Sequence, residues 1–273
     1  MIVATVLALT AACLHAAWNL LAKRSDDRFL ALWGQFAVAG VVSFVVVLAA
    51  RDLPAAAWLP AALTGLIHIP YTICLAHAYD RGDFSVAYPV ARGSGAVLSA
   101  IGGIVLLDDV LGVQAVVAIA IVAAGMGLLA VGAAPSQIAT ALIVGLCIGA
   151  YTVNDSHAVR EYGVTYPFAV FALIGVTTTG LGLATGRGRA MVATMRDGWT
   201  RYSLTGSMVA ASYALILVAV RRAPVGYVAT LRESSVLIAA FLGQRYLDEH
   251  RVRQRTIAAA VILAGLVLLI AAL

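Results

Sequence analysis

Ten long apolar stretches, separated by short polar connections, run through the chain. An α-helix rises about 1.5 Å per residue, so roughly 20 apolar residues cross the ~30 Å hydrocarbon core of a bilayer. Each stretch approaches that length, and we therefore expect ten transmembrane helices. Their approximate bounds are 2–22, 29–50, 57–79, 84–107, 112–132, 137–156, 166–185, 202–220, 225–244 and 254–273.

The fourth stretch carries a charge near its centre. Arg92 lies within the apolar run 84–107, which Asp83 precedes and Asp108 follows. A charged side chain at that depth costs about 2.5–3.5 kcal/mol on insertion scales, and such residues face protein or trapped water rather than lipid. Arg92 therefore marks a candidate functional site.

A second arginine occupies the equivalent place 140 residues later. Residues 78–131 align with 218–271 without a gap, and Arg92 falls opposite Arg232. Ser94/Ser234, Asp108/Asp248 and Gln114/Gln254 also match, which membrane composition alone does not readily produce. The chain therefore divides into two five-helix units, 1–133 and 137–273. Because five is odd, we expect an all-α membrane protein of ten transmembrane helices arranged as two inverted five-helix repeats.

Composition narrows the class further. The chain is 62% hydrophobic and 11% charged, with a mean hydropathy of +0.97, whereas soluble domains carry about 25% charged residues. The net charge of +5 sits mostly in short connections without interleaved aromatic residues, which argues against a nucleic-acid partner. Twelve basic residues in connections opposite the termini, against four on their own side, favour both termini outside.

The deep charges indicate the chemistry of a site. Glu233 follows Arg232 directly, but adjacent helical residues point about 100° apart, so Glu233 is free to reach Arg92 instead. Two deep arginines against one deep glutamate leave one positive charge, which a carboxylate or phosphate substrate would balance in arginine's bidentate fork. A structural arginine–glutamate pair is the alternative. The candidate substrate-binding residues are Arg92, Arg232, Glu233, Tyr88, Ser94, Ser234, Trp18 and Asn19.

Proton coupling has two candidates, Glu233 and His68, because a buried carboxylate can exchange a proton and histidine titrates near neutral pH. For Glu233 a structural role is weighed equally, and for His68 a satisfied hydrogen bond is favoured. Asn154 and Asp155 are expected at the end of the sixth span, as a pore mouth or helix cap. Asp108 and Asp109 are expected to be solvated caps of the next helix. No spacing predicts a metal site, and no cofactor is indicated.

Three stretches carry a resemblance to a known family. They are LHAAWNLLAK at 14–23, HAYDRGDFSVAYPVARG at 77–93 and APVGYVATLRESSVLIAAFLGQRYLDEH at 223–250. With them the chain resembles the EamA-type transporters of the drug/metabolite transporter superfamily over its whole length. The family usually ends its fourth span with Gly-Glu-Arg, where this chain has Leu107-Asp108-Asp109. The resemblance implies export or exchange of small solutes by alternating access, and it favours both termini in the cytoplasm, against the charge count.

The leading hypothesis is therefore a secondary transporter, multi-pass in the plasma (inner) membrane, moving an amino acid, organic acid or drug-like solute. Its partners would be a small-molecule substrate, with a carboxylate as one candidate group, and membrane lipid. The alternative is a lipid or lipid-linked-sugar flippase. An intramembrane enzyme is the weakest alternative, since it would need a dyad such as Ser94 with His68. The sequence leaves the substrate, the coupling ion and the oligomeric state open.

Overall fold

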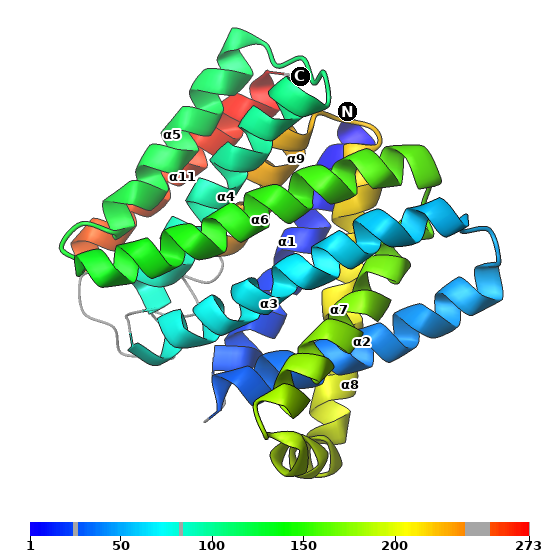
Figure 1. Cartoon of the computed structure of the whole chain (residues 1–273). Helices are drawn as coiled ribbons and strands as arrows, with labels where there is room; N and C mark the ends of the chain where they lie inside the picture. The colour runs from blue at the N-terminus through cyan, green and yellow to red at the C-terminus, as the bar shows by residue number, and fades with distance from the viewer. Residues whose placement is uncertain (24–26, 82–83, 238–251, 273) are drawn as a thin grey trace.

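A computed structural model describes residues 1–23, 27–81, 84–237 and 252–272, and this part of the chain is helical throughout with short connections (Figure 1). The helices are α1 (Ile2–Lys23), α2 (Arg28–Ala50), a short 3₁₀ helix η1 (Ala55–Ala57), α3 (Trp58–Arg81), α4 (Phe84–Leu106), α5 (Val113–Leu129), α6 (Pro135–Tyr162), α7 (Tyr166–Ala184), α8 (Gly188–Val220), α9 (Val225–Arg232) and α11 (Val252–Ala271).

The expected architecture of ten transmembrane helices in two inverted five-helix repeats is wrong. Within the described ranges, six helices are long and apolar enough to span a membrane: α2, η1 with α3, α4, α6, α7 and α8. Among the described residues, three further apolar helical stretches are shorter, at 17 residues or fewer: Ile2–Trp18, Val113–Leu129 and Thr256–Ala271. α9 has only eight residues, because its helix is interrupted after Arg232. A count of apolar residues does not detect the end of α9 at Arg232, because the apolar run continues past it.

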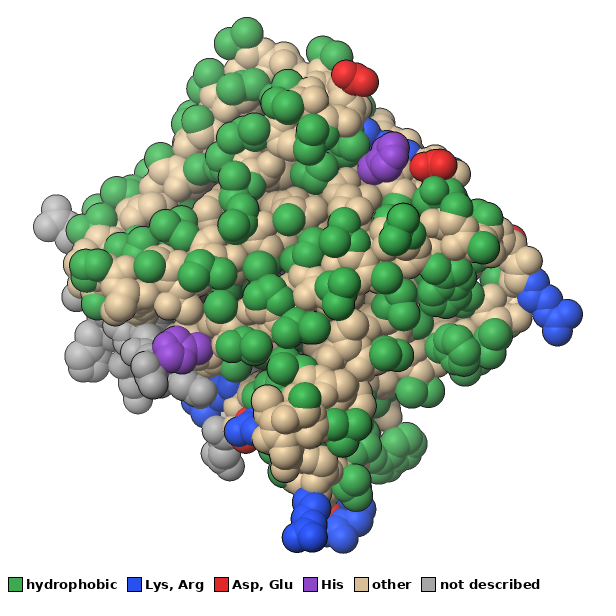
Figure 2. Space-filling model, in the orientation of Figure 1, with side chains coloured by type: hydrophobic (Ala, Val, Ile, Leu, Met, Phe, Trp, Pro, Cys, Tyr) green, Lys and Arg blue, Asp and Glu red, His purple; other side chains and the backbone are tan. Residues whose placement is uncertain are grey.

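The surface of the molecule is apolar along its helices. Figure 2 shows hydrophobic side chains spread over the face in view, with the charged groups toward its edges. On α2 alone, Val41, Phe44, Val45 and Leu48 are 48–67% exposed. Soluble monomers rarely expose contiguous apolar patches of that kind, whereas lipid solvates them. The chain is an all-helical membrane protein.

Helices α5 and α11 lie antiparallel at one edge of the molecule and exchange matching contacts (Figure 1). The Gln114 side chain donates to the carbonyl of Leu268, and Gln254 donates to the carbonyl of Leu128. Both pairs join positions related by the sequence shift of 140. The repeat seen in the sequence therefore appears here as a local two-fold pairing of two helices.

Glycine permits a second close helix pair, α2 against α7. A Cβ atom on Gly40 would lie 3.0 Å from the Cα of Gly175 and 3.1 Å from the carbonyl oxygen of Phe171. The reciprocal atom on Gly175 would lie 3.1 Å from the Cα of Gly40. Small residues at such crossings let membrane helices approach until their backbones touch. This contact fixes α7 beside α2, on the side of the molecule away from α5 and α11.

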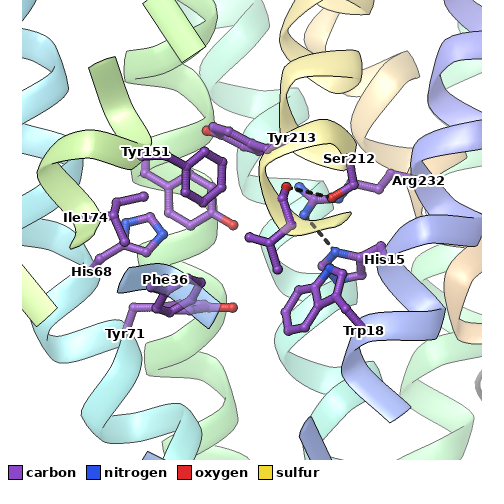
Figure 3. Close-up of a pocket in the computed structure, with 12 residues that line it drawn as sticks. His15, Trp18, Phe36, His68, Tyr71, Tyr151, Ile174, Ser212, Tyr213 and Arg232 are labelled. Atoms are coloured by element: carbon purple, nitrogen blue, oxygen red, sulfur yellow. Dashed lines mark hydrogen bonds between the residues drawn. The ribbon is translucent and has the colours of Figure 1, made fainter. Parts of the chain in front are cut away.

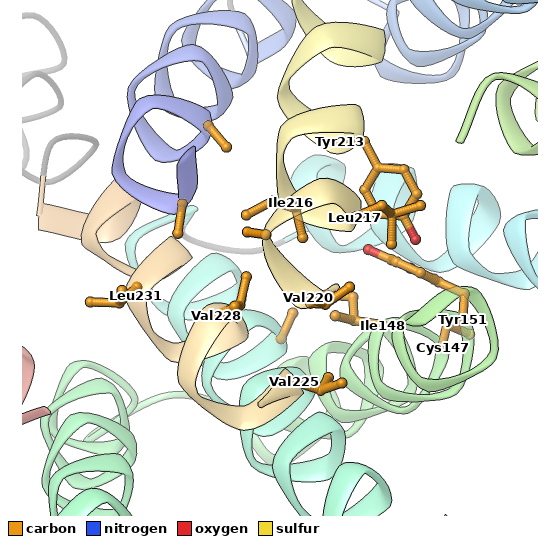
Figure 4. Packing of buried hydrophobic residues seen from close by; sticks show 14 of the residues in the cluster. Cys147, Ile148, Tyr151, Tyr213, Ile216, Leu217, Val220, Val225, Val228 and Leu231 are labelled. Atoms are coloured by element: carbon orange, nitrogen blue, oxygen red, sulfur yellow. The ribbon is translucent and has the colours of Figure 1, made fainter. Parts of the chain in front are cut away.

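The core is built where α8 passes between α6 and α9. Figure 4 shows aliphatic side chains of α8, among them Ile216, Leu217 and Val220, packed against residues of α6 and α9. These three residues are at most 1% exposed. α8 therefore joins α6 and α9, which are separate in the second half of the chain, into one continuous core.

The start of α9 is capped by Asp109, which was expected to cap the fifth helix instead. The carboxylate of Asp109 accepts the backbone N–H of Val225 at 2.6 Å and pairs with Arg160 at 2.8 Å. Its side chain is 8% exposed, so the expectation of a solvated cap on the fifth helix is wrong for Asp109. The orphan N–H groups at the start of α9 favour a carboxylate, and here it comes from a different segment.

Two helices are longer than their apolar stretches. α6 continues to Tyr162, which places Asn154 and Asp155 inside the helix rather than at its end. α8 begins at Gly188 and bends at Gly198, so the expected polar connection 186–201 is mostly helical. In both places the helix continues through polar residues that the hydrophobic pattern does not register.

Candidate functional site

A buried ion pair joins α4 to the end of α9. Arg92 donates to Glu233 twice, from Nε to Oε2 at 3.1 Å and from Nη2 to Oε1 at 2.5 Å. The two side chains are 5% and 3% exposed. One turn before Arg92, the hydroxyl of Tyr88 lies 3.3 Å from that of Ser235. The prediction that Glu233 reaches Arg92 is confirmed, and the pair fastens two segments about 140 residues apart.

The helix that carries Arg232 and Glu233 is interrupted between them. α9 ends at Arg232, Glu233 forms a turn, and residues 234–237 are helical again. The backbone N–H of Glu233 bonds to the carbonyl of Thr230 at 3.0 Å, the tighter pattern of a 3₁₀ turn. Backbone irregularity at membrane depth is tolerated where protein or a wet cavity surrounds it. The turn sends two adjacent charged side chains to different partners.

Arg232 faces a different environment from Arg92. Its Nη2 lies 3.2 Å from Nδ1 of His15, and its Cζ lies 5.9 Å from the ring centre of Tyr213. A guanidinium only donates, so His15 accepts at Nδ1, carries its proton on Nε2 and is neutral. The Nε of Arg232 has no hydrogen-bond partner among the described residues, although the residue is only 7% exposed. Arg232 is therefore a buried cation with a donor to spare.

A small cavity of about 30 Å³ opens beside Arg232 (Figure 3). Aromatic side chains form most of its wall, and Trp18 adds a second buried donor, Nε1, that lacks a partner within the described ranges. Seven helices contribute to the lining: His15 and Trp18 from α1, Phe36 from α2, His68 and Tyr71 from α3, Tyr151 from α6, Phe171 and Ile174 from α7, Val209, Ser212 and Tyr213 from α8, and Arg232 from α9. The cavity is apolar in its body and offers hydrogen-bond donors on one side.

Asp155 forms a second polar centre, next to the cavity. Its Oδ1 accepts from Thr64 at 2.6 Å, Tyr166 at 2.6 Å and Asn154 at 3.1 Å, and its Oδ2 accepts from Tyr213 at 2.5 Å. The residue is 0% exposed. The expected pore mouth or helix cap is therefore wrong for Asp155. It is a fully buried carboxyl group that connects α3, α6, α7 and α8.

Most of the predicted site residues fall into two groups. Arg92, Glu233 and Tyr88 belong to the ion-pair centre, whereas Arg232, Trp18 and His68 line the cavity. Two serines belong to neither group, since Ser94 bonds the carbonyl of its own helix at Val90 and Ser234 is half-buried with no cavity contact. The side chain of Asn19 lies outside the described residues.

His68 is held by its own helix. Its Nδ1 lies 2.8 Å from the carbonyl oxygen of Thr64, and its ring is 4.8 Å from that of Tyr151. Ser94 faces α6 instead, since a Cβ on Gly145 would collide with its hydroxyl. The Ser94–His68 dyad that the enzyme alternative requires is therefore not formed. Across the described ranges, no three His, Cys, Asp or Glu side chains gather in a metal-binding group.

Most of the cavity wall has no distinctive pattern in the sequence. Tyr71, Tyr151 and Tyr213 sit in apolar spans where an aromatic residue is ordinarily core. Their polar hydroxyls at membrane depth were the available signal, because a buried tyrosine hydroxyl requires a hydrogen-bond partner.

Comparisons with known proteins show a likeness in fold. No family model matches the chain, and no curated protein does. Among 26 matching chains of solved structures, one described only as "Crystal structure of protein" aligns with a TM-score of 0.69 at 18% identity. The match covers 97% of this chain and 95% of the other. At that identity the likeness shows a shared helical fold and nothing about activity.

Proposed function

We propose that the protein is a secondary transporter for small carboxylate-bearing metabolites, with the cavity beside Arg232 as its substrate site. In this proposal it is a multi-pass protein of the plasma (inner) membrane and exports or exchanges its substrate by alternating access. The resemblance of residues 77–93 and 223–250 to EamA-type transporters supports that reading. No nucleotide-binding motif of the P-loop kind occurs in the sequence, so a gradient would supply the energy.

One observation carries the proposal: two buried donors without partners line the same cavity. The Nε of Arg232 and the Nε1 of Trp18 are unsatisfied among the described residues, and both residues are at most 7% exposed. A buried donor left without a hydrogen bond costs about 1–3 kcal/mol, and a charged donor costs more. A ligand that brings acceptor oxygens removes that cost, and a carboxylate suits a guanidinium best.

The two deep arginines have different parts in this proposal. Arg92 is neutralised by Glu233 through two hydrogen bonds, so it holds α4 against the end of α9. Arg232 has neutral partners instead, the ring of His15 and the hydroxyl of Tyr151, and it lines the cavity. The substrate would therefore bind one arginine rather than a clamp of two.

The test is transport into proteoliposomes by purified protein, with a panel of labelled amino acids and small organic acids. Arg232→Gln should lower uptake of the transported carboxylate at least tenfold, because it removes the guanidinium that would bind the substrate carboxylate. Arg221→Gln is the matched control, since Arg221 is exposed in the turn after α8. Circular dichroism and gel filtration would establish that both variants remain folded.

Two results would overturn the proposal. Equal uptake by wild type and Arg232→Gln would remove Arg232 from the substrate site. Movement of a fluorescent phospholipid analogue, with no movement of any water-soluble compound, would indicate a lipid flippase instead.

A further inference from the structure

Asp155 is a buried carboxyl group that the proposed substrate site does not use. It is fully buried in α6, and no Lys, Arg or His nitrogen lies within ion-pair distance of it in the part of the chain described. Structural carboxylates in membranes ordinarily pair with a cation, and unpaired ones mark proton or ion pathways. Asp155 is therefore a candidate for binding a proton or an ion.

The hydrogen bonds around Asp155 describe its ionised form. An ionised carboxylate only accepts, with about four lone-pair positions, and four donors occupy them here. Three of these donors are hydroxyl groups, and each can turn to accept a hydrogen bond instead. The site is thus satisfied without a proton and can accommodate one by rotating a single O–H bond.

The deep charges of the described residues balance without substrate. Among the described residues, four buried side chains carry formal charges: Arg92 and Arg232 are positive, and Glu233 and Asp155 are negative. The sum is 2 − 2 = 0, rather than the surplus of one that the sequence indicated. An anionic substrate on Arg232 would leave this interior with one uncompensated negative charge. A single proton taken up with the substrate restores neutrality.

We infer that Asp155 is a proton-binding site coupled to the substrate cavity, so that one proton binds together with each carboxylate substrate. The inference rests on the proposed transport function and names its coupling ion. Tyr213 is the link between the two sites. Its hydroxyl is the partner of Oδ2 of Asp155, and its ring lines the cavity 5.9 Å from the Cζ of Arg232.

The link works through the direction of one hydroxyl. A proton from water that binds Oδ2 leaves that oxygen as a donor, and the Tyr213 oxygen must then accept. The hydrogen of Tyr213 consequently turns away from Asp155 toward the cavity, where it adds a donor for the substrate carboxylate. Release of the proton to water reverses each change, and no other bond forms or breaks. Proton and anion therefore strengthen each other's binding by the same factor.

Other titratable groups face this unit, and each fits the role less well. Glu233 holds Arg92 through both oxygens, so protonating it would break the buried pair. His68 on α3 would become a cation among the rings of Tyr71 and Tyr151 with no carboxylate bonded to it in the described part. The remaining groups that face Asp155 are tyrosines: Tyr166 from α7, Tyr213 from α8 and Tyr151 on α6 itself.

The first test needs no substrate. Infrared titration of the purified protein in detergent should show the carbonyl stretch of a protonated buried carboxyl group growing as the pH falls. The band should be absent in Asp155→Asn and present in His68→Gln. Asparagine has the shape of a protonated aspartate and keeps a donor for Tyr213, so this variant should fold. A wild-type spectrum without a band that belongs to Asp155 would overturn the inference, whatever the protein transports.

The second test separates the coupling from the transport. With the carboxylate identified in proteoliposomes, wild type should accumulate it when a pH gradient is imposed. The apparent affinity of the protein for the carboxylate should fall by up to about tenfold for each unit by which the pH rises. Asp155→Asn should still exchange labelled for unlabelled substrate, but without gradient-driven accumulation and without pH dependence. Asp155→Glu should restore part of both. Accumulation by Asp155→Asn equal to that of wild type would refute the coupling and leave the proposed function intact.

Discussion

Breaking the Arg92–Glu233 pair should destabilise the protein more than any other single polar substitution. The two contacts of 2.5 and 3.1 Å join side chains that are at most 5% exposed. Unit charges about 4 Å apart attract by about 4 kcal/mol at an effective dielectric constant of 20. Removing one partner also leaves the other charge buried, and measured costs for such pairs are about 3–5 kcal/mol. We expect that range for both Arg92→Met and Glu233→Gln.

The double variant makes the reasoning refutable. Arg92→Met with Glu233→Met removes both charges and leaves no orphan, so it should be more stable than either single variant. Unfolding by SDS in mixed micelles, followed by the loss of helical circular dichroism, would measure all four proteins. Single costs below about 1 kcal/mol, or additive costs in the double variant, would mean that water reaches the pair and that our account of its burial is wrong.

Two further predictions concern packing and capping. Gly175→Val should cost about 1–3 kcal/mol, because its side chain would meet the backbone of α2. Gly180→Ala, on the same helix with nothing near its Cβ position, should instead gain about 0.5–1 kcal/mol. Asp109→Ala should cost about 1–2 kcal/mol by removing the cap on α9, whereas Asp108→Asn should change stability by less than about 0.5 kcal/mol. The same micelle unfolding assay measures all four variants, and equal values within either pair would contradict the contacts described.

The sequence predicted the buried charges better than it predicted the helices. A charge in the middle of an apolar run needs a protein partner, and that rule was enough to place Arg92 and to join it to Glu233. The same rule failed for Asp155, because it sits near the end of an apolar run although α6 continues past it. Depth in the sequence is then a poor guide to depth in the fold, since neighbouring helices can bury a residue that its own hydropathy leaves near the edge.

The number of spans was beyond the reach of hydropathy for a related reason. Hydropathy averages over about 20 residues, whereas the interruption at Glu233 involves one turn. The cavity wall was also hidden, because tyrosines distributed over several helices show no common spacing in the sequence. Their meeting depends on helix packing, including the α2–α7 contact at Gly40 and Gly175, which a single sequence does not specify.

One short segment carries two charges with different partners, Glu233 bonded to Arg92 and Arg232 beside His15 and the cavity. In a continuous helix, residues 232 and 233 would point about 100° apart with fixed directions. In the structure the carboxylate of Glu233 bonds Arg92, while Arg232 extends toward His15 and the cavity. Glu233 is bonded to Arg92 of α4. A substrate that displaced Arg232 would therefore also act on this neighbouring ion pair. Substrate binding would therefore be transmitted to the contact between α4 and α9, where the two halves of the chain meet.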